Sequence, residues 1–213
     1  MTKGNINVSV ENIFPLIKKF LYSDHEIFLR ELISNATDAT LKLKHLTSVG
    51  DAKVEYGNPL IEVKVDKKGK KLHIIDHGLG MTAEEVEKYI NQIAFSGAEE
   101  FLDKYKDSAK DSGIIGHFGL GFYSAFMVAS KVEIITKSFK DEPAAHWTCD
   151  GSPQYTLEAS DKTERGTPIW LLRLPVVAKQ WYFWDKTEKI NSFVVVFPLE
   201  PVKPTIGMVK VWR

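Results

Sequence analysis

Hydrophobic positions recur with a helical period in the first quarter of the chain. Between about Glu26 and Leu46 they fall within about 60 degrees of Leu32 when successive residues are placed 100 degrees apart. One face of a long helix is therefore predicted to meet a core. That face comprises Phe28, Leu29, Leu32, Ala36, Ala39, Leu43 and Leu46. Other segments with helical patterns or helix-start signals cover residues 10–22, 82–95, 96–113 and 119–130.

Several other segments alternate between apolar and polar residues, as strands do. Residues 58–66 and 70–76 are joined by the turn-forming sequence KKGK, which predicts a hairpin. Further strands are predicted near residues 131–138, 144–150, 154–159 and 166–172. Because helices come first and the later strands follow one another directly, we expect an α+β fold: a two-layer sandwich with a mostly antiparallel sheet covered on one face by helices.

Composition narrows the function classes. The 213 residues carry 28 basic and 28 acidic side chains, so no basic excess points to nucleic acid. A single cysteine, Cys149, rules out an internal disulfide and is typical of a small buried residue. The sequence contains neither an apolar run long enough to span a membrane nor a signal peptide at its start, so a cytoplasmic protein without membrane contact is predicted.

The composition changes near residue 168. Residues 168–213 carry 7 Lys or Arg against 3 Asp or Glu, and they hold four of the five tryptophans and five of the nine prolines. This shift predicts a boundary between residues 1–167 and residues 168–213.

Three polar side chains share one stripe of the long predicted helix. Glu31, Asn35 and Asp38 stand at i, i+4 and i+7, beside the apolar face. One interpretation is a solvated face with Glu31–Asn35 and Asp38–Lys42 pairs. The other interpretation is a binding site. It is considered because Asn is unfavourable in a helix interior, so its presence there calls for a reason.

Two glycine-containing segments could complement this stripe. In IIDHGLGM, residues 74–81, Asp76 ends an apolar strand and can accept from a buried amino group, while Gly78 and Gly80 let the backbone approach a ligand. A plain turn is the alternative. In GIIGHFGLGFYSAF, residues 113–126, four glycines precede a helix and offer amides to an anion. A flexible linker is the alternative there.

Together these segments resemble the GHKL (Bergerat) ATP-binding fold of gyrase, histidine kinases, MutL and heat shock protein 90. The strings FLRELISNATDAT, IGHFGLGFYSAF and RGTPI are similar to the amino-terminal domain of the bacterial heat shock protein 90 chaperones, the HtpG type. The resemblance runs from about residue 5 to Thr167, so residues 1–167 are interpreted as one ATP-binding domain.

The resemblance implies specific roles. Glu31 would be the general base that orients and polarises the attacking water, and Asn35 would ligate Mg²⁺, a hard ion that keeps several waters. Asp76 would accept from the adenine amino group. ATP or ADP would contact Asn35, Asp38, Ala39, Asp76, Gly80, Met81, Asn91, Gly119, Leu120, Gly121, Phe122 and Thr167. Residues from about 96 to 116 would form a lid over the nucleotide.

The chain departs from the family pattern in places. His77, Phe95 and His117 replace residues usual in the family, and both histidines are interpreted as ordinary polar loop residues rather than ligands. Residues 168–213 show no family pattern, which fits a frameshift or foreign junction, or else a divergent segment that packs on the sheet.

In the family, a middle domain supplies an arginine to the γ-phosphate and a C-terminal domain dimerises. Neither is recognised here, so the sequence predicts a monomer with slow ATP turnover and no chaperone cycle of its own. The leading interpretation is the ATPase domain of a chaperone that assists folding of unfolded client proteins. The alternatives are a truncated nucleotide-binding module without useful catalysis and another GHKL enzyme such as a histidine kinase.

Overall fold

A computed structural model describes the side chains of residues 27–57, 60–66, 68–92, 101, 104–105 and 120–172, and the backbone of 194–198. The helix predicted over residues 10–22 lies outside the described residues. So do Gly119, His117, Phe95 and most of the predicted lid.

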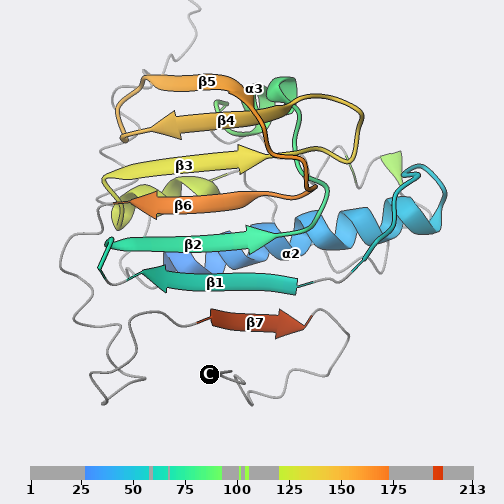
Figure 1. Ribbon diagram of the computed structural model, residues 1–213, viewed down its shortest axis with the longest axis horizontal. Helices are drawn as coiled ribbons and strands as arrows, with labels where there is room; N and C mark the ends of the chain where they lie inside the picture. The colour runs from blue at the N-terminus through green and yellow to red at the C-terminus, as the bar shows by residue number, and fades with distance from the viewer. Residues whose placement is uncertain are drawn as a thin grey trace, which may run out of the picture.

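Within the described residues, seven strands form one sheet in which every neighbouring pair is antiparallel, in the order β5-β4-β3-β6-β2-β1-β7 (Figure 1). The strands are β1 (Leu60–Asp66), β2 (Lys71–Asp76), β3 (Lys131–Thr136), β4 (Ala144–Cys149), β5 (Tyr155–Ser160), β6 (Pro168–Leu172) and β7 (Val194–Pro198). The hairpin β1–β2 and the four strands from β3 to β6 lie where the alternation predicts them, and the predicted α+β sandwich is confirmed.

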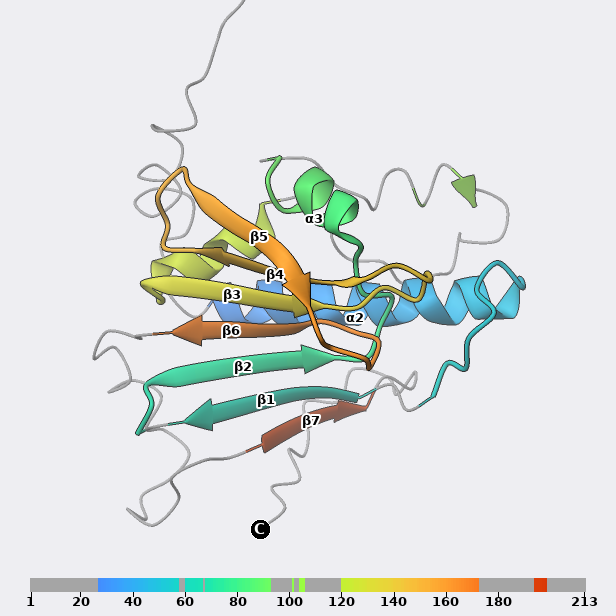
Figure 2. The ribbon, with the colours of Figure 1, turned by 45° about the horizontal axis from the view of Figure 1, so that its top comes forward.

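Helices cover one face of this sheet. α2 (Ile27–Ser48) packs against β1 and β2 and against the 3₁₀ helix η2 (Gly121–Met127), and α3 (Ala83–Tyr89) packs against β4. Figures 1 and 2 show α2 behind the strands, with its axis running roughly along them.

α3 begins as predicted but ends early. Thr82 accepts from the amide of Glu85 while the Glu85 carboxylate accepts from the amide of Thr82, which completes a capping box. The prediction that this helix continues beyond Ile90 is wrong for residues 91 and 92. Asn91 instead turns its side-chain oxygen to Trp147 Nε1, 2.9 Å away, and leaves the helical path.

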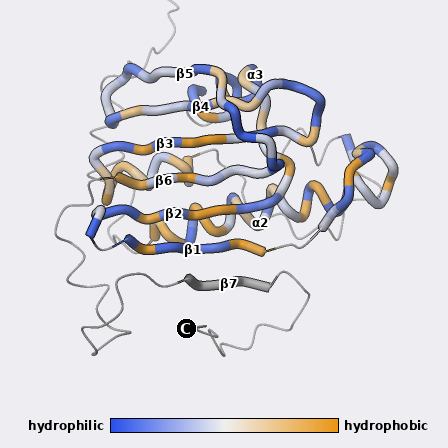
Figure 3. The backbone as a smooth tube through the Cα atoms, in the orientation of Figure 1, coloured by the Kyte–Doolittle hydropathy of each residue, from blue (hydrophilic) through white to orange (hydrophobic). Residues whose placement is uncertain are grey.

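The core lies between α2 and the sheet. Hydrophobic stretches run along β1, β2 and β3 in Figure 3, and their inward residues are buried against Phe28, Leu32 and Ala36 of α2. Two members of the predicted apolar face, Leu29 and Ala39, are only half-buried.

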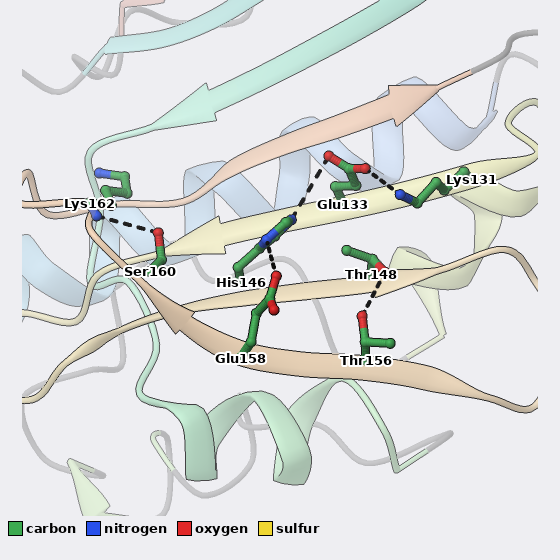
Figure 4. A network of polar contacts seen from close by, with 8 residues as sticks. All are labelled: Lys131, Glu133, His146, Thr148, Thr156, Glu158, Ser160 and Lys162. Atoms are coloured by element: carbon green, nitrogen blue, oxygen red, sulfur yellow. Dashed lines mark hydrogen bonds and ion pairs between the residues drawn. The ribbon is translucent and has the colours of Figure 1, made fainter.

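The opposite face of the sheet is polar near β3, β4 and β5. Lys131 Nζ lies 2.6 Å from Glu133, and His146 Nδ1 lies 3.1 Å from Glu158 (Figure 4). Nearby, the hydroxyls of Thr148 and Thr156 are 2.8 Å apart. Residues along these strands therefore alternate between the polar face and the buried face, as expected for strands with one side in the core.

The sheet extends past the predicted boundary at residue 168. β6 lies between β3 and β2, and β7 pairs with the outer edge of β1, from Leu60↔Pro198 to Lys64↔Val194. The boundary itself stays a prediction. No helix in the described part of the chain is long and apolar enough to cross a membrane.

Candidate functional site

Three neighbouring strands change from aliphatic to polar on their inward face at the same end of the sheet. The inward residues of β2, β3 and β6 are aliphatic until Asp76 ends β2, Thr136 ends β3 and Thr167 precedes β6. All three side chains are more than nine-tenths buried. Buried polar groups need partners, so this end of the core is built for hydrogen bonding.

Asp76 and Thr167 are directly opposite each other. The Thr167 amide donates to the Asp76 carbonyl at 3.2 Å, and the Asp76 amide donates to the Thr167 carbonyl at 3.4 Å. Residues paired in this way carry their side chains on the same face of the sheet, about 5.5 Å apart at Cα. The structure therefore brings these two predicted site residues side by side.

The Asp76 carboxyl is held at one oxygen. The Gly78 amide donates to Oδ1 at 2.9 Å, and the Thr167 amide lies close enough to act on the same carboxyl. Burial raises the pKa of Asp76 to about 7, although the Gly78 and Thr167 amides and the positive charges of Lys162 and Arg165 act in the opposite direction. A buried carboxyl at the end of a strand is suited to accept from an amino group.

The loop after Asp76 is clamped between α2 and the end of β3. The Leu79 amide donates to the Ala39 carbonyl at 3.1 Å, and the Phe139 amide donates to the Leu79 carbonyl at 2.8 Å. A Cβ on Gly78 would lie 2.6 Å from the Ala39 carbonyl carbon. Gly80 has φ +62°, and a Cβ there would lie 1.8 Å from the Lys137 carbonyl oxygen. Both glycines are therefore required by close backbone contact.

Two threonine hydroxyls lie beneath this loop. The Met81 amide donates to Thr136 Oγ1 at 2.8 Å, and Thr136 Oγ1 lies 2.9 Å from Thr167 Oγ1. Met81 and Thr167 were predicted as site residues, whereas Thr136 was not. Its only sequence signal was a polar residue at the inward position where a strand ends.

The polar stripe of α2 borders the core, as predicted. Asp38 is buried at 6% exposure, whereas Glu31, Asn35 and Ala39 are half-buried. Ala39 takes part through its carbonyl, which receives Leu79. Arg30 Nη2 lies 3.2 Å from Glu31 Oε1, but the Arg30 side chain is 72% exposed, so this pair holds the carboxylate only weakly.

Lys42 continues this stripe of α2. It lies one turn after Asp38, and burial lowers the pKa of its amino group while the Asp38 charge raises it. Its Nζ lies 5.6 Å from the centre of the Phe101 ring. The spacing to Asp38 was visible in the sequence, but its burial was not.

The glycine-rich segment meets the α2 stripe at one residue. A Cβ on Gly121 would lie 2.7 Å from Glu31 Oε2 and 3.3 Å from Glu31 Cβ. Leu120 and Gly121 begin η2, while Phe122 is buried and meets Trp147 edge-on. η2 is a single short 3₁₀ helix, so any anion contact here rests on individual amides near Glu31 rather than on a long helix dipole.

Asn91 is placed differently from the other predicted contacts. Its Oδ1 accepts from Trp147, and its Nδ2 is buried without a partner among the described residues. His77 lies on the loop after β2 with Nε2 3.8 Å from Glu62, which is consistent with an ordinary polar loop residue.

An open cavity of about 420 Å³ lies beside this site and shares none of its predicted residues. It is lined by Val54, Glu55, Lys137, Ser138, Phe139, Lys140, Asp141, Thr163 and Arg165. In the part of the chain that is described, no three acidic, histidine or cysteine side chains gather to hold a metal ion.

Comparisons with known proteins agree with the geometry. Residues 22–165 match the family described as histidine kinase-, DNA gyrase B-, and HSP90-like ATPase. The chain is 66% identical over 172 residues to the chaperone protein HtpG of Bacteroides thetaiotaomicron, which covers 80% of this chain and 25% of that protein. The HtpG of Porphyromonas gingivalis is 64% identical over 168 residues, covering 78% of this chain and 24% of the relative. The HtpG of Campylobacter jejuni is 46% identical over 165 residues, which cover 76% of this chain and 27% of the relative.

The chain thus spans about a quarter of the length of the curated relatives it matches. The resemblance to bacterial heat shock protein 90 seen in the sequence motifs is confirmed by these identities. With its antiparallel sheet, its α2 stripe and its match over residues 22–165, the chain belongs to the family of histidine kinase-, DNA gyrase B- and HSP90-like ATPases.

Proposed function

We propose that this chain binds ATP and ADP and hydrolyses ATP slowly, as the nucleotide-binding domain of a chaperone that acts on unfolded client proteins. The observation that carries the proposal is the joint placement of two features. A buried carboxyl, Asp76, lies beside Thr167 at the strand ends, and Glu31, which shares its α2 stripe with Asn35, lies against Gly121. The first suits a nucleobase, and the second suits a phosphate chain.

Adenine recognition is assigned to Asp76. Its carboxylate would accept from the 6-amino group, and the amide of Gly78 keeps Oδ1 in place. Gly80 and Met81 would line the base, on a loop that backbone hydrogen bonds fix to Ala39 and Phe139. Asp38, which precedes Ala39 on α2, adds a second buried acceptor.

Magnesium is proposed to enter with the phosphates. A hard cation that keeps its waters needs only one or two protein oxygens, and the Asn35 amide oxygen on a half-buried helix face is of the right type. The lack of a three-residue metal cluster among the described residues fits an ion held mainly by nucleotide and water. When bound, the ion would neutralise developing charge on the phosphates.

Hydrolysis is assigned to Glu31. Its carboxylate is half-buried beside Gly121, where the amides of Leu120, Gly121 and Phe122, with Gly119, would contact phosphate oxygens. From there it would orient a water and accept its proton. Slow turnover is expected because Arg165 donates to the carbonyls of residues 55 and 56 and Arg30 is 72% exposed with only a weak contact to Glu31, so neither is held toward a phosphate chain.

A nucleotide-holding module without useful catalysis is the second candidate, and the same placement of the two described arginines favours it. We further propose that the chain is monomeric and cytoplasmic, and that it binds neither nucleic acid nor membranes. These proposals rest on the balanced charge and on the resemblance to HtpG.

One experiment tests the proposal and separates the two candidates. Binding of ATP with Mg²⁺ is measured beside single-turnover hydrolysis for wild type, Glu31→Ala and Asp76→Ala. We expect Glu31→Ala to abolish hydrolysis while binding is kept, and Asp76→Ala to abolish binding. Hydrolysis that is unchanged in Glu31→Ala would overturn the assigned base, and hydrolysis that is absent from wild type would leave only the holding module. Full ATP binding by Asp76→Ala would overturn the assigned adenine site.

A further inference from the structure

Three consecutive residues of η2 contact three different elements. A 3₁₀ helix has three residues per turn, so successive side chains point about 120 degrees apart. Gly121 lies against Glu31 of α2. Phe122 meets Trp147 of β4 edge-on, with 5.6 Å between the ring centres, and Tyr123 reaches the end of α3. The rotation of η2 about its own axis therefore decides how Gly121 lies against Glu31.

The contact with α3 is a buried hydrogen bond. The Tyr123 hydroxyl donates to the carbonyl of Ile90, the C-terminal cap residue of α3, and both residues are buried. Carbonyls in the last turn of a helix have no partner within the helix, so the Ile90 carbonyl is open to such a donor. Burial raises the pKa of Tyr123, so the hydroxyl keeps the proton that it donates at any pH near neutral.

The end of α3 that receives Tyr123 is itself tied to the sheet. Trp147 Nε1 donates to Asn91 Oδ1 at 2.9 Å, and the ring of Trp147 also contacts Phe122. An indole nitrogen can only donate, so the direction of this bond is fixed. Ile90 and Asn91 thus form a common anchor for η2 and β4.

Among the three contacts of η2, the hydrogen bond resists rotation most. A hydrogen bond weakens steeply when the donor turns away from its acceptor, whereas an edge-on aromatic contact is favourable over a range of ring positions. Gly121 has no side chain that could hold the helix. Ser124 Oγ donates to the Gly121 carbonyl at 2.5 Å, which ties Gly121 to the rest of η2. A rotation of η2 would therefore move the Gly121 backbone relative to Glu31.

We propose that Tyr123 is a positioning residue for ATP hydrolysis, because its hydrogen bond to Ile90 fixes the rotation of η2 and thereby the place of the Glu31 carboxylate beside Gly121. The inference rests on the proposed function, namely that Glu31 is the base and that η2 begins with the amides that contact phosphate. Tyr123 is buried and acts through Gly121.

The test is a double-mutant cycle between Tyr123→Phe and Gly121→Ala. Tyr123→Phe removes only the hydroxyl and keeps the ring, whose centre lies 5.5 Å from that of Phe122. Single-turnover hydrolysis and ATP affinity are measured for wild type, both single variants and the double variant. Tyr123→Phe should lower the rate of hydrolysis about three- to tenfold, the size of one neutral hydrogen bond, while ATP affinity changes far less.

The cycle separates positioning from simple damage. A Cβ on Gly121 would lie 2.7 Å from Glu31 Oε2. If Tyr123 fixes η2, the helix can rotate in Tyr123→Phe and relieve this clash. The loss of hydrolysis caused by Gly121→Ala should then be at least about threefold smaller in that background than in wild type. A merely structural role of Tyr123 would leave the two losses independent, so they would multiply.

The matched control is Tyr56→Phe. The Tyr56 hydroxyl is buried without a hydrogen-bond partner among the described residues, and Tyr56 lies outside η2 and α3. This variant also removes one buried phenolic hydroxyl, but it should change neither the rate of hydrolysis nor the effect of Gly121→Ala.

Each outcome decides the inference. A wild-type rate in Tyr123→Phe, or losses that multiply in the double variant, would overturn the inference and leave the proposed function standing. A wild type that binds ATP without hydrolysing it would overturn the role assigned to Glu31, and this inference with it. Should Tyr123→Phe fail to fold, Trp147→Phe supplies the same comparison, because it releases Asn91 next to Ile90. Losses that multiply in that variant would also overturn the inference.

Discussion

The carboxylate of Glu31 lies directly against the backbone of Gly121. A Cβ on Gly121 would be 2.7 Å from Glu31 Oε2 and 3.3 Å from Glu31 Cβ. Ninety residues separate the two in the chain, yet the packing of α2 on η2 brings them into contact. Glu31, the residue proposed to activate water, can therefore take this position because Gly121, in the proposed phosphate-binding segment, has no side chain.

Replacing Gly121 by Ala should displace the Glu31 carboxylate. The added methyl meets the far end of a flexible side chain, so the free energy of unfolding should change little. Hydrolysis should fall by about 10- to 100-fold, because a shift near 1 Å misplaces a reacting group. Single-turnover hydrolysis, read beside ATP affinity, checks this, and affinity should fall far less than rate.

A double-mutant cycle is the control for that prediction. In a Glu31→Ala background, Gly121→Ala should have no further effect on hydrolysis, because no carboxylate remains to be displaced. Equal effects of Gly121→Ala with and without Glu31 would show that the methyl acts elsewhere in the site.

Asp76→Asn should stabilise the protein at high pH. Burial raises the pKa of Asp76 from its ordinary 3.8 to about 7, so the folded protein holds this proton more tightly than the unfolded chain. Below about pH 4 the group is protonated in both states, and as the pH rises toward 7 wild type loses roughly 4 kcal/mol of stability. Asn cannot ionise and can still accept from Gly78.

Urea unfolding of wild type and Asp76→Asn between pH 4 and pH 9 measures this effect. The two free energies should diverge up to about pH 7 and run parallel above it. Asp66→Asn is the matched control, since Asp66 also accepts a glycine amide, that of Gly69 at 2.8 Å, but from a half-exposed position in a turn. A constant difference between wild type and Asp76→Asn over the whole range would contradict the assigned burial effect.

Two glycines with positive φ allow backbone strain to be separated from a steric clash. Gly80 has φ +62° and would place a Cβ 1.8 Å from the Lys137 carbonyl oxygen, whereas Gly57 has φ +70° and meets no atom within 4 Å. Gly57→Ala should lower the free energy of unfolding by about 1 kcal/mol from φ strain alone. Gly80→Ala should lower it by about 3 kcal/mol or more and weaken ATP binding. Equal losses of stability in Gly57→Ala and Gly80→Ala, measured by thermal unfolding, would contradict the steric clash at Gly80.

Periodicity was sufficient for the elements near the site but not for their contacts. α2 was predicted over residues 26–46 and spans Ile27–Ser48, and the β1–β2 hairpin was predicted within two residues. The polar stripe was also placed correctly at the border of the core. The period of the apolar residues identifies the face of a helix that packs on the core, and α2 packs on the core with that face.

What periodicity could not show is where the loops return. The loop at Gly78 packs on the α2 backbone at Ala39 and Thr40, a contact between residues that are 39 and 38 positions apart in the chain. Thr136 was missed for the same reason, since its importance depends on Met81 and Thr167, which are distant in sequence. Long-range backbone contacts leave no periodic trace in either partner.

Nucleotide binding should release a proton near neutral pH. The 6-amino group of adenine donates, so it favours the ionised form of the Asp76 carboxyl, and binding should lower a pKa that burial holds at about 7. ADP affinity should therefore rise with pH below about 7 and level off above it. Titration calorimetry at pH 6.5, in two buffers of different ionisation enthalpy, measures the released protons. Purine riboside diphosphate is the ligand control, because it titrates its phosphates like ADP but lacks the amino group. Equal proton release by the two ligands would show that Asp76 does not meet the amino group.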